Sequence, residues 1–394
     1  MKTIDKINFK GEKVIIRVDY NVPMDEENRI TDSTRIQASK ETIMTVIKNG
    51  GCVVLLTHIG RPNGVEPRYS CALIIDEVTK ILGQKVLFCE STIGKKAEEA
   101  IMNLIPGQII LMENLRFHSG EIKGEITFAK HLAKLGTVYV NDAFGAAHRA
   151  HASTTIIAQF FKNKYFGKLL EKEVKAIDMV LNTGKKPILA ILGGAKISSK
   201  ITVIESLLGS VNDILIGGGM AYTFIKAKGG KIGDSICEPN FFEFAINIIE
   251  IAKSKGVKIH LPKDVIIADK FSNSANTRTC DIRKIPNGWQ GLDYGPYSLK
   301  QIKPLINKSK TILWNGPLGV FEFDSFARGT IKLGEFISGA TLKGSFSLVG
   351  GGDSVAAVKK FGFFKKMSYV STGGGAMLES LEGRDLPGIK ALED

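Results

Sequence analysis

The sequence predicts an α/β protein with two domains, each built on a parallel β-sheet. Its 394 residues are many for one hydrophobic core and suit two domains. Strand-length apolar runs alternate with helical patterns along the whole chain, and the runs are almost continuously apolar. Such runs indicate strands that are buried on both faces of a sheet, as in parallel α/β structures. Ligands of these sheets bind beyond the carboxyl ends of the strands, so the residues after each run are the candidate functional residues.

In the first half of the chain, the expected strands end in arginine and histidine. The strands are expected at 14–18, 53–57, 109–114 and 138–142, with helices between them at 35–49 and 72–82. The polar side chains that follow these strands, or open the next helix, are Asp19, Asn21, Arg35, His58, Arg61, Arg116, His148 and Arg149. Several arginines in one crevice would repel one another, whereas a phosphate or carboxylate ligand would bind them bidentately. The sequence therefore predicts a small-anion site here.

Alternatives remain open for single residues of this group. Any one arginine could form a surface salt bridge, and Arg17, which lies inside a strand, could pair with a carboxylate of the core. His58 could donate to a phosphate or could be a structural histidine. His148 and His151 are three residues apart, but no third ligand is evident, so a zinc site is not expected.

In the second half, the expected strands run into glycine. These segments span 187–196, 213–220, 311–319, 347–354 and 369–376. In the fourth, a strand at 346–349 leads into Gly350, Gly351 and Gly352, and an amphipathic helix follows. Glycine lets backbone N–H groups approach a ligand closely, and a helix N-terminus suits phosphate. The contrast between the halves predicts two ligands: a highly charged anion held by side chains, and a nucleotide lying against backbone.

Asp353 and Ser354 open that helix, and the carboxylate raises the question of a metal ion. A carboxylate beside a phosphate would repel it unless a cation lay between them, which indicates Mg²⁺ shared between Asp353 and phosphate oxygens. The alternative is that Asp353 caps the helix.

Three other charged residues follow the glycine segments. Lys196 and Lys200, four residues apart, are expected to share a helix face and could neutralise phosphate charge. Alternatively, they are surface lysines. Glu322 could accept hydrogen bonds from ribose hydroxyls, although carboxylates are common. The chain contains neither G-x-x-x-x-G-K-[ST] nor G-x-G-x-x-G, which argues against a Walker A loop and against a dinucleotide dehydrogenase.

Composition narrows the class of protein. The net charge is +13, from 53 basic and 40 acidic residues. Lysine is spread along the whole chain rather than clustered, which favours a solvated surface and small anionic substrates over nucleic-acid binding. No apolar run reaches the ~18 residues of a membrane span, and the N-terminus lacks the apolar core of a signal peptide. The five cysteines, scattered and odd in number, indicate reduced thiols and a cytoplasmic location.

A helix is expected from Gly167 to Gly184, because apolar residues recur there at helical spacing. Its place between the two sets of strands makes it a candidate connector between domains. An ordinary crossover helix is the alternative.

At this point the sequence resembles a known family over essentially its whole length and in order. The matching segments are RVDYNVP (17–23), THIGRP (57–62), LRFH (115–118), VNDAFGAAHRAH (140–151), ILGGAKISSK (191–200), IGGGM (216–220), WNGPLGVFE (314–322), GGGDS (350–354) and STGGGAMLE (371–379). They are similar to those of phosphoglycerate kinase. The resemblance implies two Rossmann-like domains that face each other across a cleft. It also implies reversible phosphoryl transfer between 1,3-bisphosphoglycerate and ADP in glycolysis, with Mg²⁺, by a monomer.

The resemblance also implies a division of the chain. Residues 1–168 would form the acid-substrate domain, 169–185 the hinge helix and 186–385 the nucleotide-binding domain, while the tail 386–394 would return to the first domain. The acid substrate would be held by Asp19, Tyr20, Asn21, Arg35, His58, Ile59, Gly60, Arg61, Arg116 and Arg149. The nucleotide would meet Lys196, Lys200, Gly217, Gly218, Gly291, Asn315, Glu322, Gly351, Gly352, Asp353 and Ser354, with Asp353 facing the metal. Catalytic roles would belong to Arg35, Lys196, Gly351 and Gly374.

Departures from the family pattern are small. Tyr20, Thr57, Ile59, Ala146 and Ser354 replace the usual Phe, Ser, Leu, Thr and Thr. None of them removes a charged group from the implied site, and Ser354 keeps a hydroxyl. A catalytically inactive scaffold is therefore not expected.

Overall fold

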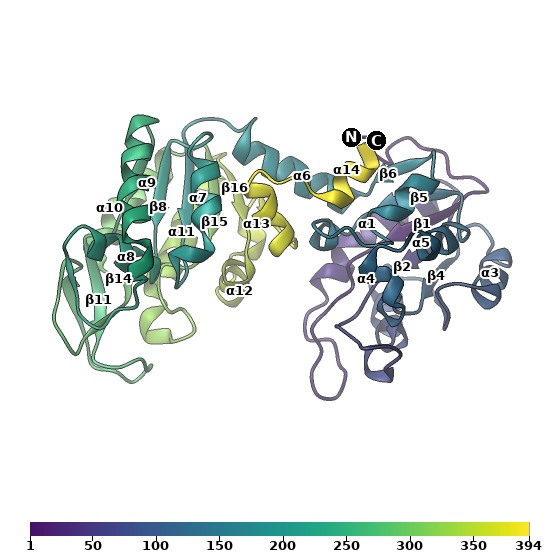
Figure 1. The fold of residues 1–394 in the computed structure, drawn as a ribbon, viewed down its shortest axis with the longest axis horizontal. Helices are drawn as coiled ribbons and strands as arrows, with labels where there is room; N and C mark the ends of the chain where they lie inside the picture. The colour runs from purple at the N-terminus through teal and green to yellow at the C-terminus, as the bar shows by residue number, and fades with distance from the viewer. Residues whose placement is uncertain (394) are drawn as a thin grey trace. The chain divides into compact units, whose positions relative to one another are not determined.

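The computed structural model describes residues 1–393 and divides into two compact units (Figure 1). The first unit comprises Met1–Val174 and Asp385–Asp394, and the second comprises Lys175–Arg384. The boundary between the units falls inside helix α6 (Lys168–Leu181), which ends before Gly184. The last residue of the expected C-terminal tail, Asp394, lies outside the described residues.

The first unit contains one six-stranded sheet in which every neighbouring pair is parallel. The strand order is β3-β4-β2-β1-β5-β6. The strands are β1 (Lys13–Arg17), β2 (Cys52–Leu56), β3 (Val86–Cys89), β4 (Ile109–Met112), β5 (Val138–Asn141) and β6 (Lys164–Phe166). The α-helices are α1 (Thr34–Lys48), α2 (Ile75–Leu82), α3 (Lys95–Met102), α4 (Ser119–Lys123), α5 (Ile126–Ala133), α6 and α14 (Pro387–Glu393). Short 3-10 helices are η1 (Pro67–Tyr69), η2 (Cys71–Ile74), η3 (Leu115–Phe117), η4 (Phe144–Ala146) and η5 (Ile156–Phe160).

Both faces of this sheet are covered. In β1, the alternate residues Val14 and Ile16 pack with Ile36 and Ile43 of α1 in one core cluster. Ile15, which points to the opposite face, is also fully buried. Burial on both faces is the physical reason for the continuous apolar run that predicted the strand.

The second unit contains another six-stranded parallel sheet, in the order β10-β8-β7-β15-β16-β17. Its strands are β7 (Ile188–Leu192), β8 (Asp213–Ile216), β10 (Lys258–His260), β15 (Thr311–Asn315), β16 (Phe346–Val349) and β17 (Tyr369–Val370). Its α-helices are α7 (Ile201–Leu207), α8 (Met220–Ala227), α9 (Phe242–Ser254), α10 (Pro296–Lys308), α11 (Arg328–Leu342), α12 (Gly352–Lys360) and α13 (Gly375–Leu381). Its 3-10 helices are η6 (Ile197–Ser199), η7 (Pro239–Phe241), η8 (Asp324–Phe326) and η9 (Phe364–Lys366).

Two small sheets accompany the main sheet of the second unit, and sequence reasoning missed them. One is antiparallel, in the order β12-β11-β14, and the other pairs β13 with β9. Their bounds are β9 (Lys231–Ile232), β11 (Asp264–Ala268), β12 (Thr277–Asp281), β13 (Lys284–Ile285) and β14 (Gln290–Tyr294). Strand β12 has the sequence TRTCD and is largely exposed, so no apolar run marks it.

The parallel α/β sheets are confirmed, and the expected strands and helices differ from the observed ones mainly at their ends. The helix expected at 72–82 is partly wrong. Its first residues form η2, where the Ser70 hydroxyl accepts a hydrogen bond from the Ala72 N–H at 3.1 Å, and the α-helix begins only at Ile75. A side chain that bonds to backbone nearby favours such a turn over a regular helix.

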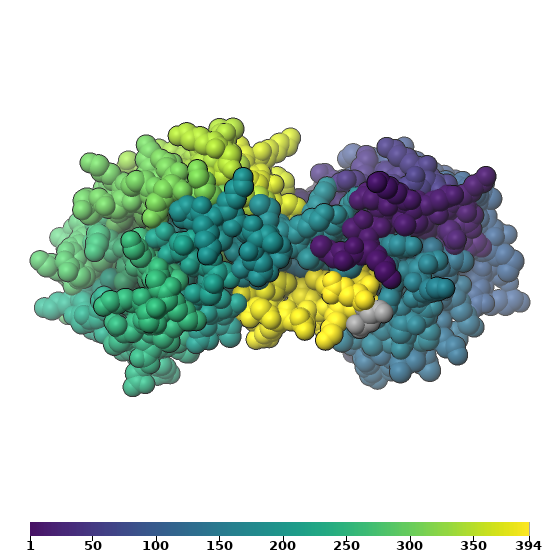
Figure 2. All heavy atoms as spheres, turned by 90° about the horizontal axis from the view of Figure 1, so that it is seen from above, coloured from purple at the N-terminus to yellow at the C-terminus, as the bar shows by residue number. Residues whose placement is uncertain are grey.

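The end of the chain packs on the first unit. Helix α14 contacts η5 and β6, the Asn141 amide donates to the Gly388 carbonyl, and the Gly388 N–H donates to the Ala147 carbonyl. In Figure 2 the yellow atoms near the end of the chain lie against blue-green atoms of the first unit. No described helix combines the length and the hydropathy that a membrane crossing requires. The structure leaves the thiols of all five cysteines unpaired.

Candidate functional site

In each unit, the candidate residues gather where the strand connections diverge. In the first sheet, β1 connects towards β2 on one side, whereas its neighbour β5 connects towards β6 on the other. In the second sheet, β7 and β15 are the corresponding neighbours. Crevices at such points, beyond the carboxyl ends of the strands, are the usual ligand sites of open α/β sheets.

The loop after β1 is held in shape by Asp19, Asn21 and Arg35. The Arg35 guanidinium lies 3.2 Å from an Asp19 carboxylate oxygen and donates to the Asn21 carbonyl at 2.8 Å. The Asn21 side-chain oxygen accepts from the Gly60 N–H at 2.8 Å, which ties this loop to the one after β2. The structure therefore brings together four of the residues predicted to hold the acid substrate, from three segments of chain.

Arg116, in η3, supplies the clearest mark of an anion site. Its side chain is only 6% exposed; one terminal nitrogen donates to the Gly60 carbonyl at 2.6 Å, while Nε has no hydrogen-bond partner among residues 1–393. Burial, together with the positive charges of Arg149 and Arg17, lowers the pKa of Arg116 to about 10. A buried donor without a partner in a positive field is costly unless an anion completes it.

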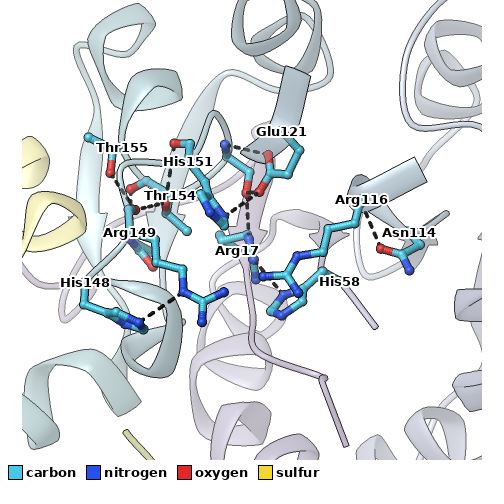
Figure 3. A network of polar contacts seen from close by, with 12 residues as sticks. Arg17, His58, Asn114, Arg116, Glu121, His148, Arg149, His151, Thr154 and Thr155 are labelled. Carbon is cyan, nitrogen blue, oxygen red and sulfur yellow. Dashed lines mark hydrogen bonds and ion pairs between the residues drawn. The ribbon is translucent and has the colours of Figure 1, made fainter. Parts of the chain in front are cut away.

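His58 and Arg17 are buried side chains of this cluster and are drawn between Arg149 and Arg116 in Figure 3. The Arg17 guanidinium bonds to His58 Nδ1 at 3.0 Å, and His58 itself is 5% exposed. Burial first, and then the charges of Arg17 and Arg116, hold the pKa of His58 well below its usual value. Arg17 does not pair directly with a core carboxylate, because its Nε donates to the Ser153 hydroxyl at 2.8 Å instead.

The remaining residues predicted for the acid substrate are placed differently. The side chains of Tyr20 and Ile59 are buried in the core, so what they could offer a ligand is backbone. Arg61 is exposed, and the structure gives it no hydrogen bond or ion pair within residues 1–393. Arg149 donates from Nε to His148 Nε2 at 3.1 Å (Figure 3), and its positive charge acts on Arg116.

The second unit contains a cavity of about 590 Å³ at its divergence point. Gly194 and Ala195 after β7, and Pro317 and Leu318 after β15, form part of its wall. The other lining residues are Gly218, Gly219, Tyr222, Ile236, Phe271, Gln290, Gly291, Leu292, Gly319, Val320, Glu322, Phe323 and Asp353. The cavity thus gathers four of the predicted nucleotide residues: Gly218, Gly291, Glu322 and Asp353. Most of its wall is apolar side chain or glycine backbone.

Close backbone approach explains two of the glycines at this site. Gly218 has a φ of +65°, and a Cβ there would lie 2.6–2.7 Å from backbone atoms of Gly194. Gly351 has a φ of +88°, and a Cβ there would lie 2.7 Å from the Asn315 amide nitrogen. Glycine is therefore the residue that both turns require.

Other predicted nucleotide residues lie outside the cavity wall but near Asp353. The Lys200 ammonium bonds to the Asn315 side-chain oxygen, and the Asn315 amide donates to the Gly350 carbonyl at 2.8 Å. Burial lowers the pKa of Lys200, and the negative charge of Asp353 opposes that shift. Lys200, Asn315 and Asp353 therefore form one polar group at the start of α12.

Two interpretations made from the sequence are wrong here. Lys196 and Lys200 do not share a helix face: Lys196 is extended, η6 lies between them, and α7 begins only at Ile201. Asp353 does not cap α12, because Gly351 takes the capping position and Asp353 lies in the first turn. The glycine turn after β7 delays the regular helix, so α-helical spacing does not apply to the two lysines.

The last predicted residues of this half surround the same turns. Ser354 is fully buried, and its hydroxyl oxygen accepts from the Gly316 N–H at 2.6 Å, which engages it with backbone. Gly217 is buried under the Leu318 side chain, which a Cβ would meet at 2.4 Å. Gly352 is the first residue of α12, and Gly374, with a φ of +51°, takes the capping position of α13.

The donor set fits a Mg²⁺ ion that arrives with a nucleotide rather than one held by protein alone. The described residues include no group of three or more His, Cys, Asp or Glu side chains able to hold a metal. Magnesium in phosphate sites commonly takes one or two carboxylates and completes its shell with phosphate oxygens and water. The single carboxylate of Asp353 on the cavity wall matches that pattern.

Sequence reasoning missed the apolar wall of the cavity. Ile236 and Phe271 are 45% and 59% exposed, and both come from irregular segments remote in sequence from the glycine turns. Their one visible signal is a large apolar side chain in a loop, which is common on protein surfaces.

Comparison with known proteins decides the family. The family model for phosphoglycerate kinase matches residues 4–384. The chain belongs to the phosphoglycerate kinase family. It is 47% identical over 416 residues to the phosphoglycerate kinase of Porphyromonas gingivalis, and the alignment covers 99% of this chain and 100% of the relative. It is also 47% identical over 392 residues to cytosolic phosphoglycerate kinase 3 of Arabidopsis thaliana, covering 100% of this chain and 98% of the relative.

A solved structure of the family agrees with the fold. The phosphoglycerate kinase of Coxiella burnetii superposes with a TM-score of 0.91 at 39% identity, covering 99% of this chain and 98% of the other. Membership supports phosphoglycerate kinase activity in glycolysis, and with it the phosphotransferase class.

Proposed function

We propose that the protein catalyses reversible phosphoryl transfer from 1,3-bisphosphoglycerate to ADP, giving 3-phosphoglycerate and ATP, with the residues named above. One observation carries the assignment of roles. The same topological position holds an arginine cluster in one unit and a glycine-lined cavity in the other. The chain therefore offers separate sites to two chemically different anions.

The first unit would bind the acid substrate through side chains. Arg116 and Arg149 would take the phosphate and carboxylate oxygens, since guanidinium groups bind both bidentately. Arg35 is already oriented by Asp19 and Asn21, so little side-chain freedom is lost when the substrate binds. Asp19 and Asn21 would meet the substrate hydroxyl, and Arg61, which is exposed, would close on the anion from solvent.

The second unit would bind the nucleotide largely through backbone and apolar contact. Ile236, Phe271 and Leu292 would pack on the base, while Glu322 would accept from ribose hydroxyls. Gly218, Gly351 and Gly352 would let backbone N–H groups reach the phosphates, and the N-terminus of α12 would add its positive dipole end.

Catalysis needs no general base in the direction of ATP synthesis, because the nucleophile is a phosphate oxygen of ADP. Lys196 and Arg35 would neutralise the equatorial oxygens of the transferring group, and Gly351 and Gly374 would present backbone to it. A bound Mg²⁺, held by Asp353 together with nucleotide oxygens, would supply further positive charge. The two ligands must come into line and exclude water for transfer to compete with hydrolysis.

The setting of this activity completes the proposal. We place the protein in the cytoplasm as a monomer that acts on small molecules, with neither nucleic acid nor membrane as a partner. The dispersed lysines support this over nucleic-acid binding, which would predict affinity that falls steeply with salt. Sedimentation of the purified protein tests the monomer, and a salt titration with duplex DNA tests the alternative.

A coupled assay tests the reaction. Purified protein is mixed with 3-phosphoglycerate and MgATP, and NADH oxidation is followed through added glyceraldehyde-phosphate dehydrogenase. Turnover that requires both substrates and Mg²⁺ is the expected result. An absence of turnover from folded protein would contradict the proposal, and separate binding measurements with ADP and 3-phosphoglycerate would then show which unit fails.

A further inference from the structure

We propose that Glu121 and Ser153 are positioning residues for the acid substrate: acting through Arg17, they fix the His58 ring as a neutral hydrogen-bond donor at Nε2. The inference rests on the proposed function and extends it, because it assigns work to two buried residues outside the set that would touch the substrate. It begins from a chain of hydrogen bonds that leads from Glu121 through Arg17 to His58 (Figure 3).

The chain of bonds is continuous and buried. Glu121, in α4, accepts from the Ser153 hydroxyl at 2.7 Å with one oxygen and from the Ser153 N–H at 3.0 Å with the other. The same hydroxyl accepts from Arg17 Nε at 2.8 Å, and another Arg17 nitrogen bonds to His58 Nδ1 at 3.0 Å. Glu121, Ser153 and Arg17 are all 0% exposed, so water does not compete for these bonds.

The direction of every bond follows from the chemistry of the guanidinium group. Arginine can only donate, so the Ser153 oxygen must accept from it, and the single hydroxyl hydrogen is left for Glu121. For the same reason, His58 Nδ1 must be the unprotonated nitrogen of the ring. The ring proton then resides on Nε2, and this tautomer is set by the donor opposite Nδ1.

The negative charge of Glu121 partly compensates the buried positive charge of Arg17. Among the described residues, Arg17 has no carboxylate within ion-pair distance. Its third contact is with the Val18 carbonyl, which is neutral, as its Ser153 and His58 partners are. Burial raises the pKa of Glu121, and the positive charge of Arg17 opposes that shift. A carboxylate one hydroxyl away therefore offsets part of the cost of burying the guanidinium.

The surroundings of His58 favour the neutral ring. The charged and titratable groups that act on it are Arg17, Arg116, His151 and Arg35. Burial and the positive charges of the three arginines oppose protonation of the ring, and His151 acts in the same direction when it is protonated. A neutral ring with its proton on Nε2 can donate to an anionic oxygen. While Arg17 donates to Nδ1, the proton cannot move to Nδ1, so the ring stays a donor at Nε2. This is a positioning function that the arginine cluster alone does not supply.

The experiment combines the His58 tautomer with substrate kinetics. Nitrogen-15 spectra of selectively histidine-labelled full-length protein are recorded for wild type, Ser153→Ala and Glu121→Gln, with His58 assigned by its loss in His58→Gln. Glu125→Gln is the matched control, because Glu125 is an exposed carboxylate in the loop after the same helix. KM for 3-phosphoglycerate and for MgATP, and kcat, are measured on each variant.

The expected result has two parts. Wild type and Glu125→Gln show His58 protonated at Nε2 alone, while Ser153→Ala shows both tautomers, and Glu121→Gln shows a smaller change. KM for 3-phosphoglycerate rises about tenfold in Ser153→Ala while KM for MgATP stays within about twofold, the size expected for one charge-assisted bond.

Two findings would overturn the inference. The first is a wild-type spectrum that shows His58 protonated at Nδ1. This measurement is made on wild type, so it is valid even if a variant fails to fold. The second is an unchanged tautomer and unchanged KM for 3-phosphoglycerate in folded Ser153→Ala. Because the tautomer is read without turnover, failure of the inference and failure of the proposed reaction are distinguishable.

Discussion

The two units use the same sheet topology to present opposite kinds of surface at the same place. In the first unit, charged side chains from several loops converge where β1 and β5 part, and Arg116 keeps a buried donor, Nε, that has no partner in the described part of the chain. In the second, the corresponding turns after β7 and β15 are glycine backbone around a largely apolar cavity. The fold fixes where a ligand binds, whereas the residues that end the strands decide which ligand it is.

The difference has an electrostatic consequence. Burial is the largest cause of the depressed pKa values of Arg116 and His58 in the first unit, and neighbouring positive groups lower both pKa values further. In the second unit, the shift of Lys200 comes mainly from burial, and Asp353 acts against it. A site made of side chains stores repulsion that its ligand relieves, whereas a site made of backbone dipoles does not.

The largest effect on catalysis is expected from Lys196, a charged side chain in the second unit, whose site is otherwise lined mainly by backbone and apolar groups. Lys196→Ala should lower kcat by ~10²–10³, or ~3–4 kcal/mol, while ADP affinity changes by less than about threefold. The reason is that its charge would meet the transferring group and not the bound nucleotide. Lys226→Ala, an exposed lysine on α8, is the control. Equal changes in kcat and in ADP affinity would refute the assignment.

In the arginine cluster, Arg116→Met should weaken binding of 3-phosphoglycerate by ~10–100-fold, the value of one or two hydrogen bonds to a charged group at ~1.5–3 kcal/mol. ADP binding should not change. Isothermal titration with each ligand measures both. The control is Arg68→Met, because Arg68 is exposed and pairs with Glu66 at 2.8 Å. A loss of affinity as large in Arg68→Met would mean that net charge, and not the position of Arg116, sets affinity.

Gly218→Ala tests the backbone geometry of the second unit. In contrast to Arg116→Met, it should weaken ADP binding and leave 3-phosphoglycerate binding unchanged. The added Cβ meets the Gly194 backbone, so the turn must shift at a cost of ~1–3 kcal/mol. Gly229→Ala is a matched control, since Gly229 also has a positive φ, +82°, but a Cβ there meets nothing within 4 Å. If both variants lose ADP affinity equally, conformational strain and not close approach is the cause.

The smallest effect concerns pH. Burial, with neighbouring positive charges, lowers the pKa of His151 to about 4. The folded chain therefore binds fewer protons at this residue than the unfolded chain between about pH 6.5 and 4, and stability is lost as pH falls through that window. Asp142, whose pKa burial raises to about 8, acts in the opposite direction, so the test is a difference between two proteins.

That difference is measured by chemical denaturation of wild type and of His151→Gln at several pH values. His151→Gln should lose less stability on acidification from pH 6.5 to 4 than wild type does, because it lacks the group that takes up the proton on unfolding. Parallel curves for the two proteins would show that His151 titrates alike in the folded and unfolded states.

Much of the fold follows from local pattern. The strands at 14–18 and 346–349 were expected because their residues form almost continuous apolar runs. Such runs arise where both faces of a sheet are buried, since the side chains on either face then meet the core. The contrast between strands that end in arginine and strands that end in glycine could also be predicted from the sequence, since close backbone turns restrict which residues can follow a strand. Strand β12 and the cavity wall at Phe271 could not be predicted, because exposed residues and loop residues meet no such restriction.

What the sequence by itself determined is the class of fold, the two kinds of strand end and the family to which they belong. Only the tertiary structure decided how Lys196 and Lys200 are presented, that Gly351 rather than Asp353 caps α12, and that Arg17 reaches Glu121 through Ser153. Residue type and spacing record local backbone preference and burial. The partners of a buried polar group can lie far apart along the chain, 136 residues for Arg17 and Ser153 and 247 residues for Asn141 and Gly388, and no local pattern encodes such a distance.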